Sequence, residues 1–493
     1  MSACGAEIEP PDSEGALPRE TRFDSAVDSL LEELDGNLAP GVSIAVMEHG
    51  EIVWAEGFGS ASPLDDVPVE IDTTFMIGST TKQLTAMAVL TQVDDGLYSL
   101  DDTIAELLPE FIVASTSEWT EQTTMRHLLS HQSGLQDAYV ITGTGDDAGL
   151  ASHYYGPYRE TAMVMTPPGT LYNYSNPGVD LAGLIVEEHD PQGRRYPDIV
   201  NEEIFAPLGM TRSFARVAEA AAAGNYADSI GFDADQVVLG EFPDFQLGEP
   251  VPLTIEELQD AAAQRPAGTA TFSTPSDMCR WGDFLIHGNE EVVSDHVRAM
   301  LTTPEVDTQL SDPMSYGLGI VVWDQFPLSG DPFTSTEYHP ITVWEHGGNT
   351  LSFTSSLIIV PDHDVVVSIL SNGTGSTHAA TQSAVLEVVL DELPPPSTYT
   401  PDLDPSRFSE LAGTYDAAEI GEIAITEGGA NGLQISIPSF AERGFEVQPD
   451  LIPVSTYVWL SADLGLDFTF IRDEQGELTP WLRTRYFVGK RED

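Results

Sequence analysis

The chain contains very little lysine and few positive charges of any kind. Its 493 residues carry 80 acidic side chains against 19 basic ones, a formal net charge of −61, and the two lysines are Lys82 and Lys490. So much negative charge repels phosphate, which excludes ordinary nucleic-acid binding. It is also typical of adaptation to high salt, where screening weakens self-repulsion. An acidic extracellular protein with no salt requirement is the alternative interpretation.

Long apolar runs are absent and cysteine is rare. No stretch of 18 apolar residues occurs, so the sequence predicts no transmembrane segment. Two cysteines cannot form a disulfide framework, and Cys279 fits a small buried residue of a helix. Cys4, within Ser2-Ala3-Cys4-Gly5, resembles the end of a bacterial lipobox. It predicts a lipid anchor and an extracytoplasmic location, periplasmic or secreted; an ordinary N-terminal tail is the alternative.

What the sequence does contain is enough apolar surface for a sizeable core, because 41% of its residues are hydrophobic. Period-two and helical patterns occur at both ends of a long helix-and-loop region, about residues 80–330. They predict an α/β fold: an antiparallel sheet of five or more strands, flanked by terminal helices, with a large inserted helical domain. The predicted helices are 24–36 and 378–393, and the strands are 42–47, 52–58, 342–345, 353–360 and 365–370.

Four segments are predicted along the chain. Residues 1–22 form an acidic N-terminal tether, 23–393 the main α/β domain, 394–405 a proline-rich linker and 406–493 a small antiparallel β domain, similar to a barrel. The strands predicted in the last segment are 422–426, 433–437, 454–460, 466–472 and 484–488.

The first candidate for chemistry is the Ser79-Thr80-Thr81-Lys82 stretch. Ser79 follows Gly78 and precedes a helical run, so its backbone N–H can support an oxyanion at a helix N-terminus. Lys82 lies three residues on, on the same helix face, where a desolvated amine can act as base for the serine. A capped helix with a surface lysine is the structural alternative. The rarity of lysine in this chain favours the functional one.

Two polar segments further along could complete such a site. Tyr174 offers a phenol for proton relay, and Asn176 an amide that can orient Lys82 or a substrate carbonyl. Gly347 and Gly348 allow a substrate to lie along a strand, with the Asn349 N–H as second oxyanion donor opposite that of Ser79. Taken singly, each segment is also compatible with an ordinary polar turn.

Together and in this order, these segments resemble the serine β-lactamase and penicillin-binding-protein superfamily. The likeness is to its class C-like branch, which includes family VIII carboxylesterases, D-stereospecific peptidases and DD-carboxypeptidases. It spans about residues 24–393 and includes further matching stretches. These are Gly96 to Asp102, Met125 to Leu135, Pro266 to Thr269, Ser273 to Met278 and Tyr316 to Gly319. Residues 411–415 and 468–472 resemble the lipocalin-type domain appended to some members.

The resemblance implies a role for each residue. Ser79 would be the acylated nucleophile, and Lys82 and Tyr174 would share the acid–base work. Asn176 would hold the acyl side of the substrate, and His346 would face the leaving group or its carboxylate. Gln136 or Asp137 would line the pocket. Arg126 and His131 would pack and hydrogen-bond near the site.

One departure from the family bears on the substrate. Many members carry Lys-Thr-Gly where this chain has His346-Gly347-Gly348, and a histidine near its usual pKa is mostly neutral at pH 7. With the acidic charge, this favours small or short-chain neutral esters, hence a carboxylesterase. The alternatives are a D-amino-acid peptidase, DD-carboxypeptidase or weak β-lactamase, or a non-catalytic penicillin-binding-type sensor.

No cofactor is expected. The sequence has no His-Glu-x-x-His, no glycine-rich phosphate loop and no Gly-x-Ser-x-Gly elbow. We therefore expect neither a catalytic metal nor an α/β-hydrolase, and the expected partner is a small-molecule ester or amide substrate.

Overall fold

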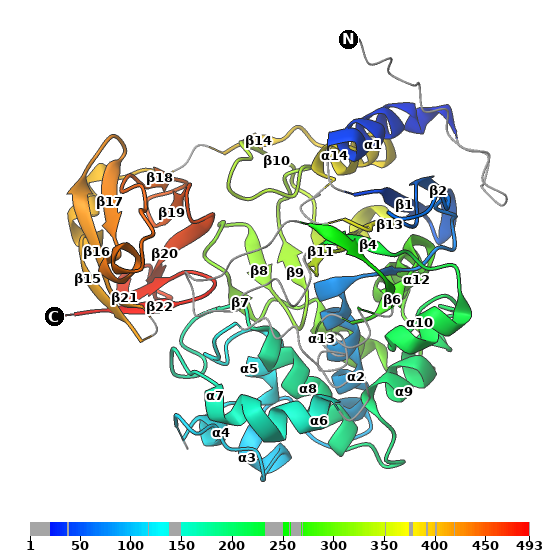
Figure 1. Cartoon of the computed structure of the whole chain (residues 1–493), viewed down its shortest axis with the longest axis horizontal. Helices are drawn as coiled ribbons and strands as arrows, with labels where there is room; N and C mark the ends of the chain where they lie inside the picture. The colour runs from blue at the N-terminus through cyan, green and yellow to red at the C-terminus, as the bar shows by residue number, and fades with distance from the viewer. Residues whose placement is uncertain are drawn as a thin grey trace.

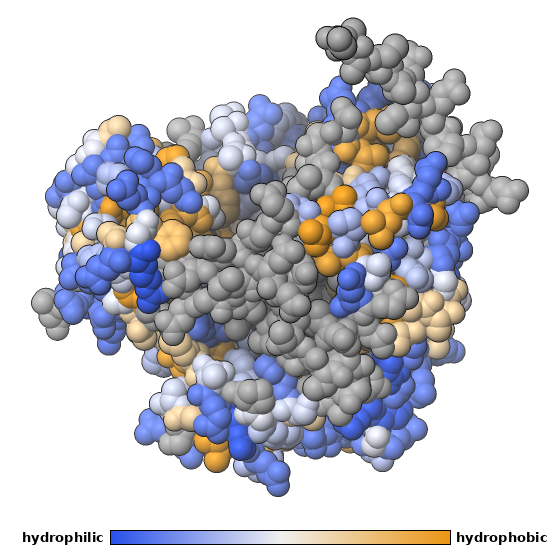
Figure 2. Space-filling model, in the orientation of Figure 1, coloured by the Kyte–Doolittle hydropathy of each residue, from blue (hydrophilic) through white to orange (hydrophobic). Residues whose placement is uncertain are grey.

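A computed structural model describes residues 20–36, 39–116, 118–137, 149–231, 250–255, 257, 268, 270–350, 352–373, 378–390, 393–399, 402–418 and 420–492. The proposed anchor at Cys4 and most of the predicted tether lie outside the described residues. No helix in the described part of the chain has the length and apolar character needed to cross a membrane. The coloured part of the surface in Figure 2 is largely hydrophilic.

The two ends of the region between residues 24 and 390 share one antiparallel sheet, here called the large sheet. Its eight strands run in the order β2-β1-β13-β12-β11-β9-β8-β7. At the β1–β2 turn, His49 and Gly50 both have positive φ, 53° and 75°, as a tight two-residue hairpin requires. The strands are β1 (Gly41–Glu48), β2 (Glu51–Gly59), β7 (Val306–Asp307), β8 (Met314–Tyr316), β9 (Val321–Trp323), β11 (Val343–Asn349), β12 (Thr354–Val360) and β13 (Val365–Ser371).

Alternate residues of each central strand enter two different cores. In β1, Ile44 and Val46 pack with α1 (Asp24–Gly36) and α14 (Ala379–Val389), which lie together on one face (Figure 1). Ala45 and Met47 point the other way, toward α12 (Pro275–His287) and the helical region. Both faces of the sheet are therefore covered, which explains why these strands read as nearly continuous apolar runs.

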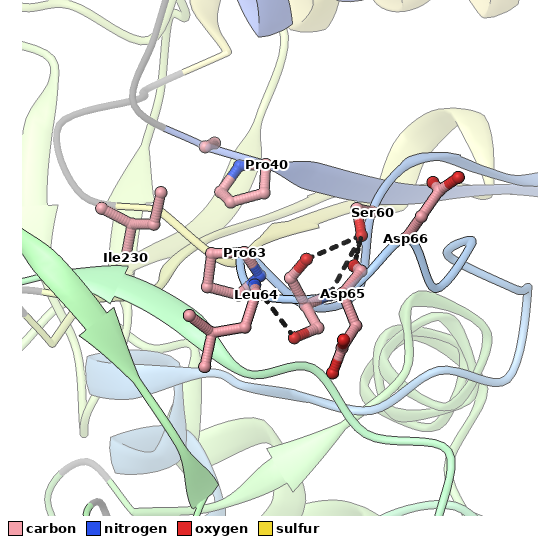
Figure 3. A pocket seen from close by; sticks show the side chains of 9 residues that line it. Pro40, Ser60, Pro63, Leu64, Asp65, Asp66 and Ile230 are labelled. Atoms are coloured by element: carbon pink, nitrogen blue, oxygen red, sulfur yellow. Dashed lines mark hydrogen bonds between the residues drawn. The ribbon is translucent and has the colours of Figure 1, made fainter.

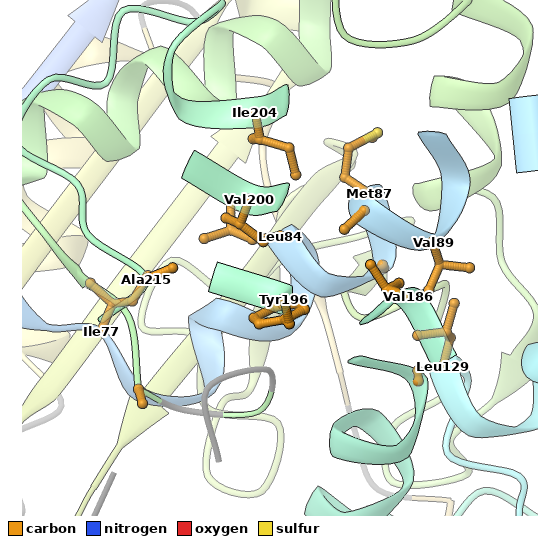
Figure 4. Close-up of a cluster of buried hydrophobic side chains, with 14 of the residues drawn as sticks. Ile77, Leu84, Met87, Val89, Leu129, Val186, Tyr196, Val200, Ile204 and Ala215 are labelled. Atoms are coloured by element: carbon orange, nitrogen blue, oxygen red, sulfur yellow. The ribbon is translucent and has the colours of Figure 1, made fainter. Parts of the chain in front are cut away.

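Helix α2 (Thr81–Asp94) is buried on every side along its length from Thr81 to Gln92. Its apolar residues pack among helices of the inserted region (Figure 4). Two of its polar residues contact specific side chains: Gln83 accepts a hydrogen bond from Trp281, and the Thr85 hydroxyl lies 2.7 Å from that of Tyr196. A helix held this firmly provides a rigid support for the residues at its N-terminus.

The inserted region consists of short helices joined by long connections. They are α3 (Ile104–Leu107), α4 (Trp119–Gln122), α5 (Met125–Leu129), α6 (Gly149–His153), α7 (Arg159–Thr161), α8 (Asn176–Glu188), α9 (Tyr196–Val200), α10 (Val217–Ala223) and α13 (Asp295–Leu301). Two small sheets accompany them, β3 (Phe75–Met76) with β6 (Phe272–Ser273) and β4 (Ser229–Gly231) with β5 (Val251–Leu253). The predicted α/β architecture with a helical insertion is confirmed. Cys279 is buried in α12, as predicted.

A second eight-stranded antiparallel sheet, the C-terminal sheet, follows and has its own apolar core. It lies to one side of the first region (Figure 1). Its strands are β15 (Gly413–Ala417), β16 (Gly421–Gly428), β17 (Gly432–Ser436), β18 (Ile452–Pro453), β19 (Val458–Ser461), β20 (Leu466–Arg472), β21 (Leu478–Arg483) and β22 (Val488–Arg491), with helices α15 (Phe408–Leu411) and α16 (Pro438–Glu442).

Three sequence predictions in this part of the chain need correction. The segment 484–488 is not a strand: Thr484 to Phe487 form a turn, and β22 begins at Val488. Only the second half of 454–460 is a strand. The proline-rich segment 394–405 includes β14 (Ser397–Thr398), which pairs with β10 (Glu337–Tyr338), so the segment is attached to the first region by a ladder.

Candidate active site

Ser79 lies in a 3-10 turn, Gly78–Thr80, immediately before α2. Gly78 has a φ of 54°, and a β-carbon at this position would lie 3.0 Å from the backbone nitrogen of Asn349. The turn therefore packs directly against the end of β11. This brings the backbone of the Ser79 turn beside that of Asn349, the second predicted oxyanion donor.

Lys82 is completely buried, and its amine is surrounded by oxygen atoms. The Nζ atom lies 3.0 Å from Ser79 Oγ, 2.7 Å from Asn176 Oδ1 and 3.0 Å from the carbonyl oxygen of Gly268. Asn176 is the first residue of α8, where its position is fixed by the Ser175 cap and Pro177. The Ser79–Lys82 pair is thus held by contacts to two distant segments.

The amide of Asn176 has a defined orientation because its two ends meet different chemistry. Asp137 Oδ1 accepts hydrogen bonds from Asn176 N, at 3.0 Å, and from Nδ2, at 2.9 Å. The Asp137 carboxyl oxygen accepts and the Lys82 amine donates, so Nδ2 must face Asp137 and Oδ1 must face Lys82. The sequence alone left open whether Gln136 or Asp137 lines the site. Asp137 is the residue in contact with Asn176.

Tyr174 stays protonated in this environment. Burial raises the pKa of its hydroxyl well above the usual 10, against the opposing effects of the Arg485 cation and of a hydrogen bond to Ser79. Lys82 Nζ lies 5.0 Å from the centre of the Tyr174 ring. A phenol in this state is suited to donate a proton rather than to remove one.

The strand β11 lies beside the nucleophile turn. Its pairing with β9 ends at Glu345, whereas its pairing with β12 continues to Asn349. The Ser355 hydroxyl donates to the Ile77 carbonyl at 2.7 Å, and Thr80 Oγ1 lies 3.1 Å from the His346 carbonyl oxygen. These contacts join the turn before α2 to the segment 346–349.

His346 is neutral and hydrogen-bonded at both ring nitrogens. Nδ1 lies 2.6 Å from the Gly347 carbonyl oxygen, and Nε2 lies 3.1 Å from the Tyr316 hydroxyl. Burial is the main cause that lowers its pKa to about 3, and the Lys82 charge adds to it. This residue therefore brings no positive charge where many family members have a lysine.

A second histidine shares the same tyrosine. His131 Nδ1 accepts from the Ser175 N–H at 3.1 Å, and its Nε2 lies 3.1 Å from the Tyr316 hydroxyl. Burial lowers the pKa of His131 well below 6.5, so the ring is neutral and Nε2 carries the hydrogen. Tyr316 then accepts from His131 and donates to His346. The Arg126 side chain forms ion pairs with Asp101 and Glu305.

The C-terminal sheet contributes a residue that the sequence did not reveal. Arg485, in the turn before β22, places Nε 2.9 Å from Asp137 Oδ2, and its guanidinium carbon lies 4.7 Å from the centre of the Tyr174 ring. Gln136 donates to the Tyr486 carbonyl at 3.2 Å, so this predicted pocket residue contacts the same turn. Sequence spacing gives no signal for a partner 348 positions away.

The described part of the molecule has a further group of potential ligands and a separate hollow. Ligand atoms of Asp283, His287 and Asp364 lie within 4.8 Å of one another, but His287 already pairs with both carboxylates. A separate hollow of about 570 Å³ is lined mainly by the 60–66 loop (Figure 3). Its Ser60 hydroxyl is bonded to carbonyl groups of its own loop. Neither cluster offers a nucleophile with a base.

Comparison with known proteins places this site in a family context. The model of the family described as "Beta-lactamase" matches residues 27–390, a range that includes Ser79, Lys82, Tyr174 and His346. Arg485 lies outside the matched range.

Similar proteins include enzymes and a penicillin-binding protein. Penicillin-binding protein 4 of Amycolatopsis lactamdurans is 28% identical over 402 residues, 76% of this chain and 93% of that protein. A D-aminopeptidase of Cereibacter sphaeroides (strain KD131 / KCTC 12085) is 27% identical over 376 residues, 76% of this chain and 64% of that protein. The octameric penicillin-binding protein homologue from Pyrococcus abyssi has the same fold, with a TM-score of 0.58 and 19% identity, over 95% of this chain and 99% of that one.

Proposed function

The chain belongs to the beta-lactamase family of serine hydrolases, and we propose that it is a carboxylesterase of small or short-chain esters that acts through an acyl-enzyme on Ser79. The observation that carries the proposal is the set of contacts around Lys82. A neutral amine has two N–H groups and one lone pair. Asn176 Oδ1 and the Gly268 carbonyl can accept these two N–H groups, and in the neutral form the lone pair can receive the Ser79 proton across the 3.0 Å between Nζ and Oγ.

In the first step, Lys82 removes the Ser79 proton while Oγ attacks the ester carbonyl. The N–H groups of Ser79 and Asn349 stabilise the oxyanion that forms. As the C–O bond to the leaving alcohol breaks, the protonated Tyr174 gives its proton to the alkoxide and regains one from Lys82. Water then attacks the acyl-Ser79 ester, releases the acid and restores the serine.

The choice of an ester rests on the charge at His346. A fixed cation near the leaving group would favour substrates with a carboxylate there, as in cell-wall peptides and β-lactams. His346 is neutral because its pKa is lowered to about 3, and Tyr316 and Gly347 occupy its ring nitrogens. An uncharged leaving alcohol suits this environment, since it requires no counter-ion.

A second candidate function is a D-amino-acid peptidase. It is favoured by the similarity to a D-aminopeptidase over 76% of the chain and by the Arg485 guanidinium beside Tyr174. The same acyl-enzyme chemistry would cleave an amide, with Tyr174 protonating the leaving amine.

Initial rates on three chromogenic substrates test the proposal: a nitrophenyl acetate or butyrate, a D-alanine nitroanilide and a cephalosporin. Fast Ser79-dependent turnover of the ester, with slow turnover of the other two, supports a carboxylesterase. A nitroanilide rate above the ester rate would transfer the assignment to the peptidase. Rapid cephalosporin turnover would contradict the argument from His346.

A further inference from the structure

The turn 484–487 of the C-terminal sheet is fixed firmly against the inserted helical region. The preceding residue, Arg483, is buried and donates to the carbonyl oxygens of Tyr172, at 3.0 Å, and Thr308, at 2.8 Å. On the other side of Arg485, the Tyr486 carbonyl accepts from Gln136. Arg485 is therefore presented to the site from a backbone that is anchored on both sides.

Arg485 meets a carboxylate that is fully buried. The Asp137 side chain has no exposed surface, and its two oxygens have different partners. Oδ2 accepts from Arg485, whereas Oδ1 accepts both N–H groups of Asn176. Loss of the Arg485 donor would leave this buried oxygen without its hydrogen bond, which is costly in free energy.

We infer that Arg485 and Asp137 are positioning residues for the general base, and that the C-terminal sheet completes the active site through them. The contacts run from Arg485 to Asp137, from Asp137 to the Asn176 amide, and from Asn176 Oδ1 to Lys82 Nζ at 2.7 Å. Arg485 fixes the position of the Asp137 carboxyl, that carboxyl fixes which end of the amide faces Lys82, and the amide oxygen directs the amine toward Ser79. This inference rests on the proposed Ser79–Lys82 chemistry.

The same contacts predict what removal of Arg485 does. Without the guanidinium, Asp137 Oδ2 loses its donor, and the carboxyl can turn away from the two N–H groups of Asn176. The Asn176 amide can then rotate and present Nδ2, a donor, to an amine that needs an acceptor. Small displacements of a catalytic group lower the rate by about 10²-fold.

The test uses the full chain and a neutral nitrophenyl ester, which has no carboxylate for Arg485 to bind. We expect Arg485→Gln and Asp137→Asn each to lower kcat about 10- to 100-fold with KM changed less than about two-fold. The double variant should be no slower than the slower single variant, because both act on one contact chain. Arg485→Lys should recover part of kcat by restoring a cation.

Arg472→Gln is the matched control. It removes the same charge from the C-terminal sheet, while the contacts of Arg472 with Gln309 are made by backbone atoms and persist. We expect its kcat to equal that of the wild type. Thermal unfolding of each variant shows whether it is folded at the assay temperature. If Arg485→Gln is unfolded at the assay temperature, two variants still provide the comparison. They are Arg485→Lys and the double variant, in which neither charge of the pair is left alone.

Three results would overturn the inference: wild-type kcat in Arg485→Gln, a rise in KM with kcat unchanged, or independent multiplication of the two single effects.

The rate at which a fluorophosphonate labels Ser79 separates this inference from the proposed function. If the wild type is labelled but does not hydrolyse esters, the ester proposal fails, and slower labelling of Arg485→Gln still supports the positioning role. Equal rates of Ser79 labelling in the wild type and in Arg485→Gln would contradict the positioning role.

Discussion

Gly348 lies so close to the carbonyl group of Ile77 that a β-carbon on Gly348 would be 2.0 Å from the Ile77 oxygen. This approach brings β11 against the turn that carries Ser79. The adjacent Gly347 is different, because a β-carbon there would meet only the Ser355 carbonyl oxygen, at 3.7 Å. Two neighbouring glycines of one motif thus have different steric requirements.

Gly348→Ala should therefore separate β11 from the nucleophile turn. We expect a loss of about 1 to 3 kcal/mol in the free energy of unfolding, as for overpacking, and a fall in kcat of about 10²-fold as the Asn349 N–H moves. Denaturant unfolding and ester kinetics measure the two effects. Gly347→Ala is the control and should unfold like the wild type. Equal destabilisation by the two substitutions would contradict this account of the contact.

Lys82→Ala removes the base and leaves the Ser79 hydroxyl without its proton acceptor. We expect kcat to fall by about 10³-fold or more, in the range that general-base catalysis provides. The control is Lys490→Ala, on β22, where the amine lies 5.4 Å from the centre of the Trp481 ring. It should retain full activity. Comparable losses in both variants would indicate a general effect of lysine removal rather than a specific base.

The carboxyl of Glu345 makes stability depend on pH. Burial raises its pKa from 4.5 to about 7 despite a hydrogen bond from Trp323. Between these values the folded state binds more protons than the unfolded state, so stability decreases as the pH rises from about 4.5 to 7. Glu345→Gln should be more stable than the wild type by about 1 to 3 kcal/mol at pH 8.

The advantage of Glu345→Gln should disappear near pH 4.5, where the wild-type carboxyl is protonated in the folded state. Denaturant unfolding at pH 4.5 and pH 8 measures the difference, with the exposed Glu422→Gln as control. The His346 contribution has the opposite sign, since a pKa lowered to about 3 reduces stability as the pH falls below 6.5. It is common to both proteins and cancels in their comparison. A constant difference at the two pH values would refute the assignment to Glu345.

Molar NaCl should raise both the thermal midpoint and the ester rate. A net charge of −61 opposes compaction, and the screening length falls from about 8 Å at physiological ionic strength to about 3 Å at 1 M. Differential scanning calorimetry in NaCl measures the effect, with sucrose, which does not screen charge, as the control. A flat response to NaCl would remove the interpretation of salt adaptation.

The parts of the fold that depend on local patterns were predictable. The 24–36 helix matches α1 residue for residue, and the apolar runs at both ends of the region form β1, β2, β12 and β13. One common sheet was predicted for the strands at the two ends of the region, because strands of one sheet must lie together in space. Short strands such as β7 and β8, of two and three residues, have too few positions to show a period.

The site was predictable where its residues lie close together in sequence. The Ser79–Lys82 pair follows from helical spacing, and its contact is 3.0 Å. Arg485 was missed because Thr484, Tyr486 and Val488 alternate like a strand, whereas tertiary contacts of Arg483 and Tyr486 shape this segment as a turn. Burial raises the pKa of Glu345 and lowers that of His346, and the spacing of residues in a sequence does not reveal burial.

The most direct test of the central claim is mass spectrometry of the enzyme quenched during turnover of a nitrophenyl ester, followed by peptide mapping. The account predicts a mass increase of one acyl group, located on Ser79 and absent from Ser79→Ala, which should also lose turnover while remaining folded. An acyl group on another residue, or undiminished turnover by Ser79→Ala, would contradict it.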